Sequence, residues 1–149
     1  KSTRIRVTRG TFFGHRNCPL SVKKKLRSVL AELIEHRGVD TFYVGRQGDF
    51  DGIVLSVLRE LAYVYPHISY NVVLERLPGK RDDPALDLSI TMFPEGLEFA
   101  PPRFAISWRN EWMLKRADYV VTYVTHGWGG AAQFAEKAKR QGKTVIGLA

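Results

Sequence analysis

Residues 118–134 read DYVVTYVTHGWGGAAQF, a hydrophobic run that breaks into a glycine-rich turn and then into small and apolar residues. This pattern predicts a buried strand followed by a turn that opens a helix. The first N–H groups of a helix have no partner within the helix, and the helix dipole favours negative charge beside them. The turn Gly127-Trp128-Gly129-Gly130 could therefore hold a phosphate or carboxylate through main chain alone, although a tight turn without a ligand would show the same pattern.

Short apolar runs alternate with helical patterns along the rest of the chain. Strands are predicted at residues 11–13, 41–44, 70–74, 118–124 and 144–148, and helices at 19–37, from an N-cap at Asp51 to Pro66, from just after the proline pair 101–102 to about Arg116, and at 130–141. Such alternation is typical of parallel strands joined by crossover helices. We predict one α/β domain over residues 11–149, a three-layer Rossmann-like fold with a mainly parallel sheet of about five strands and helices on both faces. The basic segment 1–10 is either flexible or extends the first strand.

The composition fits a single globular domain. The chain has 149 residues, of which 44% are hydrophobic, enough for a real core. No run approaches the roughly 18 apolar residues of a membrane span, and the basic N-terminus has no apolar leader pattern, so a soluble cytoplasmic protein without membrane contact is expected. Cys18 is the single cysteine, which excludes an internal disulfide and supplies no metal-ligand pair. We expect no metal ion.

The net charge of +8 suggests an anionic partner. The basic residues fall in four short clusters, at 1–9, 23–27, 80–81 and 137–143. Most of these fit solvated helix faces or chain ends. A solvated surface is therefore the favoured explanation of the positive charge, and nucleic-acid binding is the less favoured one.

Glycines follow three of the predicted strands. They are Gly14 after the first strand, Gly45 and Gly48 after the second, and Gly127, Gly129 and Gly130 after the fourth. Open parallel sheets bind ligands at the carboxyl ends of their strands, where the strand order reverses. The three turns are expected to converge on one crevice that holds a phosphate-bearing ligand. His15 and Arg16, directly after the first strand, could reach phosphate oxygens or a base.

A charged residue lies on the apolar side of the third predicted helix. At about 100° per residue, Arg109 projects among Ala105, Ile106, Trp112 and Met113. A buried charge needs a partner, which is a carboxylate such as Asp49, Asp51 or Glu95, a set of main-chain carbonyls, or a ligand phosphate. The sequence leaves these alternatives open. Asn110, on a neighbouring face, is expected to line the same crevice.

Five short motifs resemble one known group of proteins. They are Phe-Phe-Gly-His-Arg at 12–16, Phe-Tyr-Val-Gly at 42–45, Pro-Glu-Gly-Leu-Glu at 94–98, Arg-Asn-Glu-Trp-Met at 109–113 and Trp-Gly-Gly-Ala-Ala-Gln-Phe at 128–134. Together they resemble the SLOG superfamily, a Rossmann-like group that includes the Lonely Guy phosphoribohydrolases and the DNA-processing proteins of natural transformation, and most of all its small bacterial members. The resemblance implies a nucleotide or nucleotide derivative over the glycine turns, and a homodimer or larger homo-oligomer.

The chain departs from the enzymes of that group. The phosphoribohydrolases carry Pro-Gly-Gly-x-Gly-Thr-x-x-Glu, whose carboxylate acts on the N-glycosidic bond, and an Arg-Lys pair on the preceding helix. Here Phe134 stands at the glutamate and Asn110 at the lysine, while Arg109 keeps the arginine. Because Phe134 cannot transfer a proton, a nucleotide-binding sensor is expected rather than an efficient enzyme.

Two alternatives remain. The first is an N-glycosidic hydrolase of nucleoside monophosphates or nucleotide sugars, in which Glu95 or Glu98, from a long segment at 77–102 without clear periodicity, supplies the carboxylate. The second is single-stranded DNA binding, favoured by the basic charge. No cofactor other than the nucleotide ligand is expected.

Overall fold

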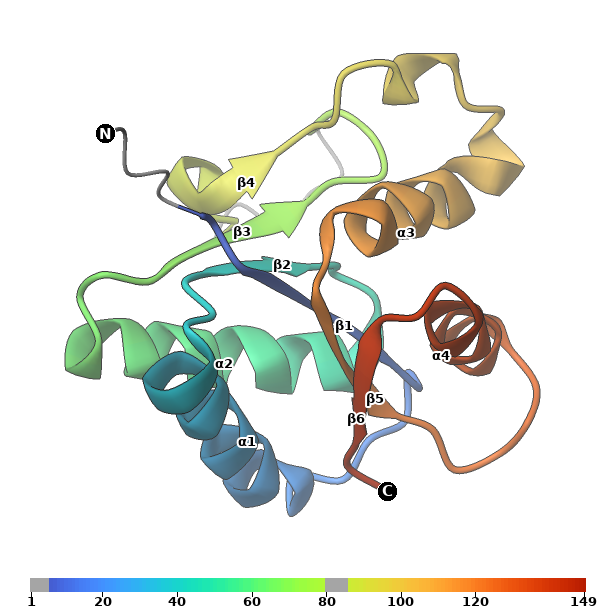
Figure 1. Ribbon diagram of the computed structural model, residues 1–149. Coiled ribbons are helices and arrows are strands. Elements are labelled where there is room, and N and C mark those ends of the chain that lie inside the picture. Colours follow the sequence, from blue (N-terminus) through green and yellow to red (C-terminus); the bar gives the residue numbers. More distant parts are fainter. Residues whose placement is uncertain (1–5, 80–85) are drawn as a thin grey trace, which may run out of the picture.

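A six-stranded parallel sheet forms the centre of the molecule, of which the computed structural model describes residues 6–79 and 86–149 (Figure 1). The strands are β1 (Arg9–Gly14), β2 (Thr41–Val44), β3 (Ser69–Val73), β4 (Thr91–Met92), β5 (Tyr119–Tyr123) and β6 (Thr144–Gly147), in the order β4-β3-β2-β1-β5-β6. This confirms the α/β, Rossmann-like prediction, with six strands in place of about five.

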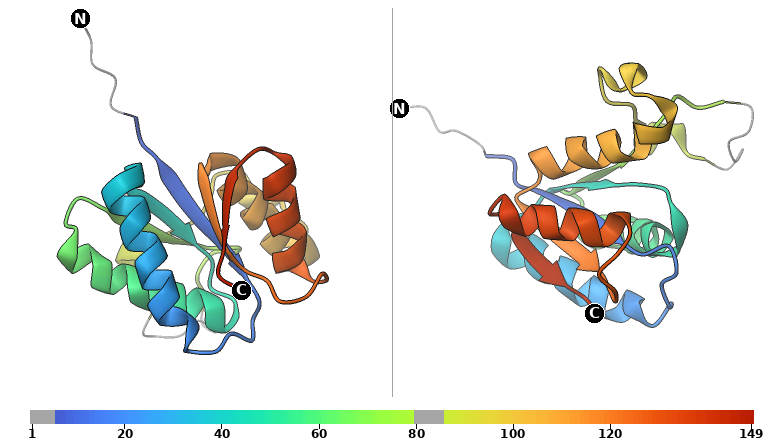
Figure 2. Two further views of the ribbon diagram at one scale, coloured as in Figure 1. Left: turned by 60° about the horizontal axis from the view of Figure 1, so that its bottom comes forward. Right: turned by 90° about the vertical axis from the view of Figure 1, so that its right-hand side faces the viewer.

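Helices cover both faces of the sheet. They are α1 (Val22–Arg37), α2 (Gly48–Val64), α3 (Ala105–Arg116) and α4 (Gly130–Arg140), with short 3₁₀ turns η1 (Leu88–Ile90), η2 (Leu97–Phe99) and η3 (Pro102–Phe104). Figure 2 shows α1 and α2 on one side of the sheet and α3 and α4 on the other. The result is a three-layer arrangement.

The strand sequences are apolar because both faces are buried. Successive side chains of a strand point to opposite faces. Phe12 joins the cluster formed by α1 and α2, whereas Phe13 packs on the other side against Phe134 of α4, with ring centroids 5.3 Å apart. A parallel strand covered on both faces carries a continuous apolar run rather than an alternating one.

The edge strand β4 is the element that the sequence analysis missed. It has two residues, which pair with β3 as Val72 with Thr91 and Val73 with Met92. Two residues are too few to show a period of two, so no local pattern marks them. The segment 77–102 is thus partly ordered by β4, η1 and η2, while residues 80–85 lie outside the described part, as do residues 1–5 of the basic segment. β1 begins at Arg9.

Three helix starts differ from the prediction. α3 begins at Ala105 rather than directly after the proline pair, because Pro102–Phe104 form the 3₁₀ turn η3. α1 begins at Val22 rather than at Pro19, because Leu20 and Ser21 form a turn in which the Pro19 carbonyl accepts from Val22 N–H at 3.1 Å. α2 begins at Gly48, with Gln47 as its N-cap. Asp51 is therefore not the N-cap: it lies inside the first turn, and its carboxylate accepts a hydrogen bond from Gln47 N–H at 2.8 Å.

The strand order reverses beside β1. The chain moves from β1 outward through β2, β3 and β4 on one side, and then returns to β5, which pairs with β1 on its other side. The connection after β1 leads to α1 on one face, and the connection after β5 leads to α4 on the opposite face. Connections that diverge in this way leave a crevice at the carboxyl ends of the two strands.

Candidate functional site

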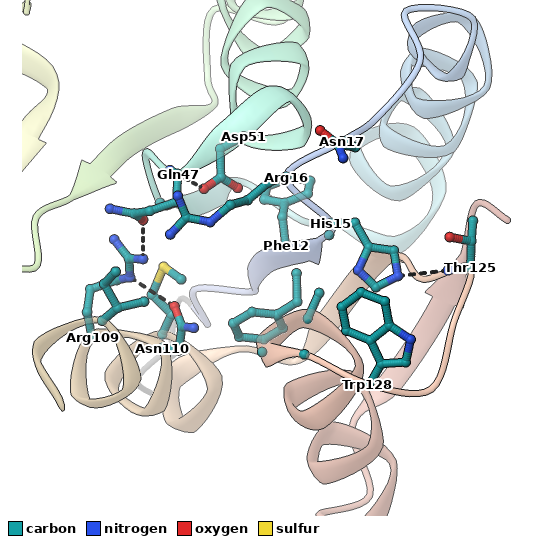
Figure 3. Close-up of a pocket in the computed structure, with 18 of the residues that line it drawn as sticks. Phe12, His15, Arg16, Asn17, Gln47, Asp51, Arg109, Asn110, Thr125 and Trp128 are labelled. Carbon is teal, nitrogen blue, oxygen red and sulfur yellow. Dashed lines mark hydrogen bonds between the residues drawn. The ribbon is translucent and has the colours of Figure 1, made fainter. Parts of the chain in front are cut away.

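A pocket with a volume of about 670 Å³ opens at the carboxyl ends of β1 and β5 (Figure 3). Its walls come from the end of β1, the turn between β2 and α2, one side of α3, and the turn between β5 and α4. Pockets for small ligands typically measure about 300–1,000 Å³. The predicted site residues that line it are Gly14, His15, Arg16, Gly45, Arg109, Asn110, Trp128, Gly129 and Gly130.

Four predicted residues do not line this pocket. Gly127 lines a second pocket, formed by the same turn and α4. Glu95 and Glu98 are exposed beside η2 and bring no carboxylate to the pocket. Gly48 has a packing role, because at its φ of 83° a Cβ would lie 2.5 Å from the Arg16 Cα atom.

Two of the lining glycines are required by protein packing. A Cβ on Gly14 would lie 2.1 Å from a ring carbon of Phe50, which is fully buried on α2. A Cβ on Gly45 would lie 2.9 Å from the Asp51 carboxylate and 3.0 Å from the Arg109 guanidinium. Their missing side chains make room for protein groups, so the turns after β1 and β2 are not open phosphate cradles.

The turn between β5 and α4 is open. Gly129 has a φ of 92°, a backbone conformation that favours glycine, and a Cβ on Gly130 would meet nothing within 4 Å. The first N–H to bond back into the helix is that of Gln133, which donates to the Gly129 carbonyl at 3.0 Å. Among the described residues the N–H groups at 130–132 have no hydrogen-bond partner. Main-chain donors are thus available where Gly130 and Ala131 border the pocket.

Arg109 is held by neutral protein groups. It is only 2% exposed. Its Nη1 donates to the Val73 carbonyl at 2.9 Å, Nη2 to Gln47 Oε1 at 2.5 Å, and Nε to Asn110 Oδ1 at 2.9 Å. Within residues 6–79 and 86–149 it forms no ion pair, so among the predicted alternatives the structure shows the main-chain carbonyl rather than the salt bridge. Burial lowers the pKa of Arg109, and the negative charges of Asp51 and Glu75 oppose this decrease.

Asp51 is a pocket residue that the sequence analysis did not assign. Burial raises the pKa of its carboxyl to about 6, against the opposing effects of the Gln47 hydrogen bond and the charges of Arg109 and Arg16. A carboxyl with such a pKa changes protonation near neutral pH. The available signal was its place just after the glycines that follow a predicted strand, a position that also fits helix capping or an ion pair.

Gln47 was also missed, and it connects the charged groups of this wall. Besides accepting from Arg109, it donates through Nε2 to Glu75 Oε1 at 3.1 Å. Glu75 in turn accepts from Arg46 Nε at 2.6 Å. Such a network fixes the positions of side chains before any ligand arrives.

Arg16 presents its charge differently from Arg109. It is exposed, and Figure 3 shows its side chain extending from the end of β1 toward Gln47 and Asp51. In the described part of the chain its guanidinium forms no hydrogen bond or ion pair. Its donors are therefore available to an anion, whereas those of Arg109 are largely used.

The opposite wall carries a stack of three aromatic rings. His15 lies parallel to His126 with centroids 3.7 Å apart, and His126 lies parallel to Trp128, also at 3.7 Å. His15 Nε2 accepts from Thr125 N–H at 2.9 Å, and burial together with the neighbouring His126 lowers the pKa of His15. The acceptor role and the lowered pKa favour a neutral His15 with its proton on Nδ1. Figure 3 places His15 and Trp128 across the pocket from Arg109.

No family model and no curated protein matches this chain. Membership of the SLOG superfamily, a homo-oligomeric state and a cytoplasmic location therefore stay predictions from the sequence. In the described ranges no helix combines the length and the apolar character that crossing a bilayer requires.

Proposed function

We propose that this chain binds a nucleotide or nucleotide derivative in the pocket and holds its phosphate through main-chain N–H groups and Arg16. The observation that carries the proposal is that main-chain donors at the start of α4 and the Arg16 guanidinium, all without a partner among residues 6–79 and 86–149, border the same pocket. That pocket lies where the strand order reverses, the usual ligand position in this class of sheet. The motif resemblance to the SLOG superfamily agrees with this ligand class.

The physical basis is charge and hydrogen bonding. A phosphate at the start of α4 would accept from N–H groups that have no partner in the described part of the chain, and it would interact favourably with the helix dipole. The planar guanidinium of Arg16 can donate two parallel hydrogen bonds to phosphate oxygens. Arg109, buried behind it, adds positive potential without giving up its protein partners.

Calorimetric titration and thermal shift against ribose 5-phosphate and a panel of nucleoside phosphates test the proposal. A ligand that binds only the folded state raises the melting temperature according to RT ln(1 + [L]/Kd). We expect Arg16→Gln to weaken binding about tenfold or more, since hydrogen bonds to charged groups contribute roughly 1.5–3 kcal/mol. Its melting temperature without ligand should not change.

Arg37→Gln is the matched control, because Arg37 is exposed at the end of α1 and is not part of the pocket. It should bind like the wild type. Wild-type affinity in Arg16→Gln would contradict the role of Arg16. A wild-type protein that binds no phosphate compound would overturn the proposal.

Asp51 favours a second candidate, N-glycosidic hydrolysis. Cleavage needs a proton on the departing base while water attacks the anomeric carbon, and an acid with a pKa near the working pH supplies it most effectively. Asp51, with a pKa of about 6, is such an acid inside the pocket, and it replaces Glu95 and Glu98 in this role. Chromatography should detect free base released from nucleoside monophosphates, with Asp51→Asn inactive and Glu98→Gln active. No release by the wild type would eliminate this candidate and leave binding intact.

Single-stranded DNA binding has only the net charge of +8 in its favour. An electrophoretic mobility shift over a salt series tests it, because contacts to phosphates lose affinity steeply as salt increases. Lack of any shift at low salt would exclude it.

A further inference from the structure

Trp128 is exposed and yet held in one orientation. It is 72% exposed, but one face of its indole lies on His126 at a centroid distance of 3.7 Å and an interplanar angle of 19°. His126 in turn lies on His15, at 3.7 Å and 13°. Among the described residues no second ring stacks on the indole, and its exposure leaves the other face open beside the pocket that Trp128 lines.

The inner end of this stack is anchored to the main chain. His15 is 9% exposed, its N–H donates to the Tyr123 carbonyl at 3.1 Å, and its Nε2 accepts from Thr125 N–H at 2.9 Å. Both partners lie where β5 passes into the glycine turn. The position of the indole is thus set by the same main chain that places the N–H groups of Gly130 and Ala131.

We propose that the open face of Trp128 is a base subsite, which takes the aromatic base of a nucleotide whose phosphate lies at the start of α4. The inference rests on the proposed function and adds the place where the aromatic base of the ligand binds. Trp128 and Gly130 are two positions apart in one turn, so a base on the indole and a phosphate on the N–H groups can belong to one nucleotide with its ribose between them. Bases stack on aromatic side chains whatever their identity, and purines offer the larger area.

The surroundings favour a small aromatic ligand over a protein partner. Gly127 and Gly129 flank Trp128 in sequence, and both are exposed, so the turn gives the indole no continuous apolar surface. Protein interfaces are built on larger contiguous patches. The far side of the pocket carries the polar Arg109, Asp51 and Asn110 together with Ile106 and Met113. Among the aromatic side chains of the lining, Trp128 is the most exposed and offers a flat surface for a base.

Titration calorimetry with AMP and with ribose 5-phosphate, which lacks the base, tests the subsite. We expect the wild type to bind AMP about tenfold more tightly than ribose 5-phosphate. Trp128→Leu should reduce AMP affinity to that of ribose 5-phosphate and leave ribose 5-phosphate binding unchanged. Trp128→Phe keeps an aromatic face and should retain most of the preference.

Trp108→Leu serves as the matched control, because Trp108 is also exposed but lies outside the pocket; it should keep the full preference. If the wild type binds both ligands equally, or if Trp128→Leu keeps the preference for AMP, the base subsite is wrong while phosphate binding stands. If the wild type binds neither ligand, the proposed function fails and the base subsite with it.

Discussion

The Arg109 guanidinium donates a hydrogen bond to the main-chain carbonyl of Val73 across 2.9 Å and thereby joins α3 to the last residue of β3. The bond is buried on both sides, since Arg109 is 2% exposed and Val73 is fully buried. An arginine on the apolar side of a helix is stable here because strand and turn acceptors lie within its reach. Arg109, for which the sequence left a carboxylate, main-chain carbonyls and a ligand phosphate open as partners, is thus mainly a structural connection.

We predict that Arg109→Met destabilises the fold by about 3 kcal/mol, because the Val73 carbonyl and Gln47 lose a buried donor. Urea unfolding should show a lower midpoint. Arg37→Met, at an exposed position, should change stability by less than about 0.5 kcal/mol. An unchanged midpoint in Arg109→Met would mean that these hydrogen bonds contribute little.

Asp51 should make stability depend on pH. Its pKa is raised from 3.8 to about 6 in the folded state, so the folded protein holds this proton more tightly than the unfolded chain. The contribution of this proton to the free energy of unfolding is fully present below pH 3.8. It is lost as pH rises through 6, and the loss amounts to up to about 3 kcal/mol. Asp51→Asn removes this contribution, so its stability relative to the wild type should increase from pH 4 to pH 7, as urea unfolding at each pH would measure.

Asp87→Asn is the control for that experiment. Hydrogen bonds from Ser89 lower the pKa of the exposed Asp87, so its contribution is present above the unfolded pKa and is lost on acidification. Over pH 4 to 7 the relative stability of this variant should therefore stay nearly constant, and it should change only below about pH 3.8, in the opposite direction. A parallel response of the two variants would contradict the assignment for Asp51.

Gly14 and Phe50 should behave as a coupled pair. Gly14→Ala places a methyl group 2.1 Å from the Phe50 ring, an overlap that we expect to cost about 1–3 kcal/mol or more in the free energy of unfolding. Phe50→Leu frees some of this space, so the double variant should be more stable than the sum of the single effects predicts. Additive effects in the double-mutant cycle would show that the two residues do not compete for the space.

Gly130→Ala should separate ligand binding from stability. A Cβ at this position meets no protein atom within 4 Å, so the fold should be as stable as the wild type or slightly more so. The added methyl group stands beside the N–H groups proposed to hold phosphate, so the affinity for ribose 5-phosphate should decrease in calorimetry. Gly127→Ala, equally open but outside the pocket, should keep the wild-type affinity.

Local sequence patterns were sufficient for most of the fold. Apolar runs and helical periodicity located the five longer strands and all four α-helices to within a few residues, because each pattern reports which faces of a segment are buried. They failed at β4, whose two residues are ordered only by pairing with β3. The Asp51 prediction failed because helix capping depends on the exact first turn, which Gln47 begins.

For the candidate site, the sequence by itself determined where the strand ends and glycine turns meet, since the carboxyl ends of parallel strands share one edge of the sheet. Only the tertiary structure decided what each side chain does there. Arg109 is 36 residues from Val73 and 62 from Gln47, and His15 is 110 from Thr125. Local periodicity can show that a charge or ring is buried, but its partner depends on the strand order β3-β2-β1-β5. That order is why Arg109 is occupied by protein acceptors, why Arg16 keeps donors without a partner in the described part of the chain, and why Trp128 stacks on His126, which stacks on His15.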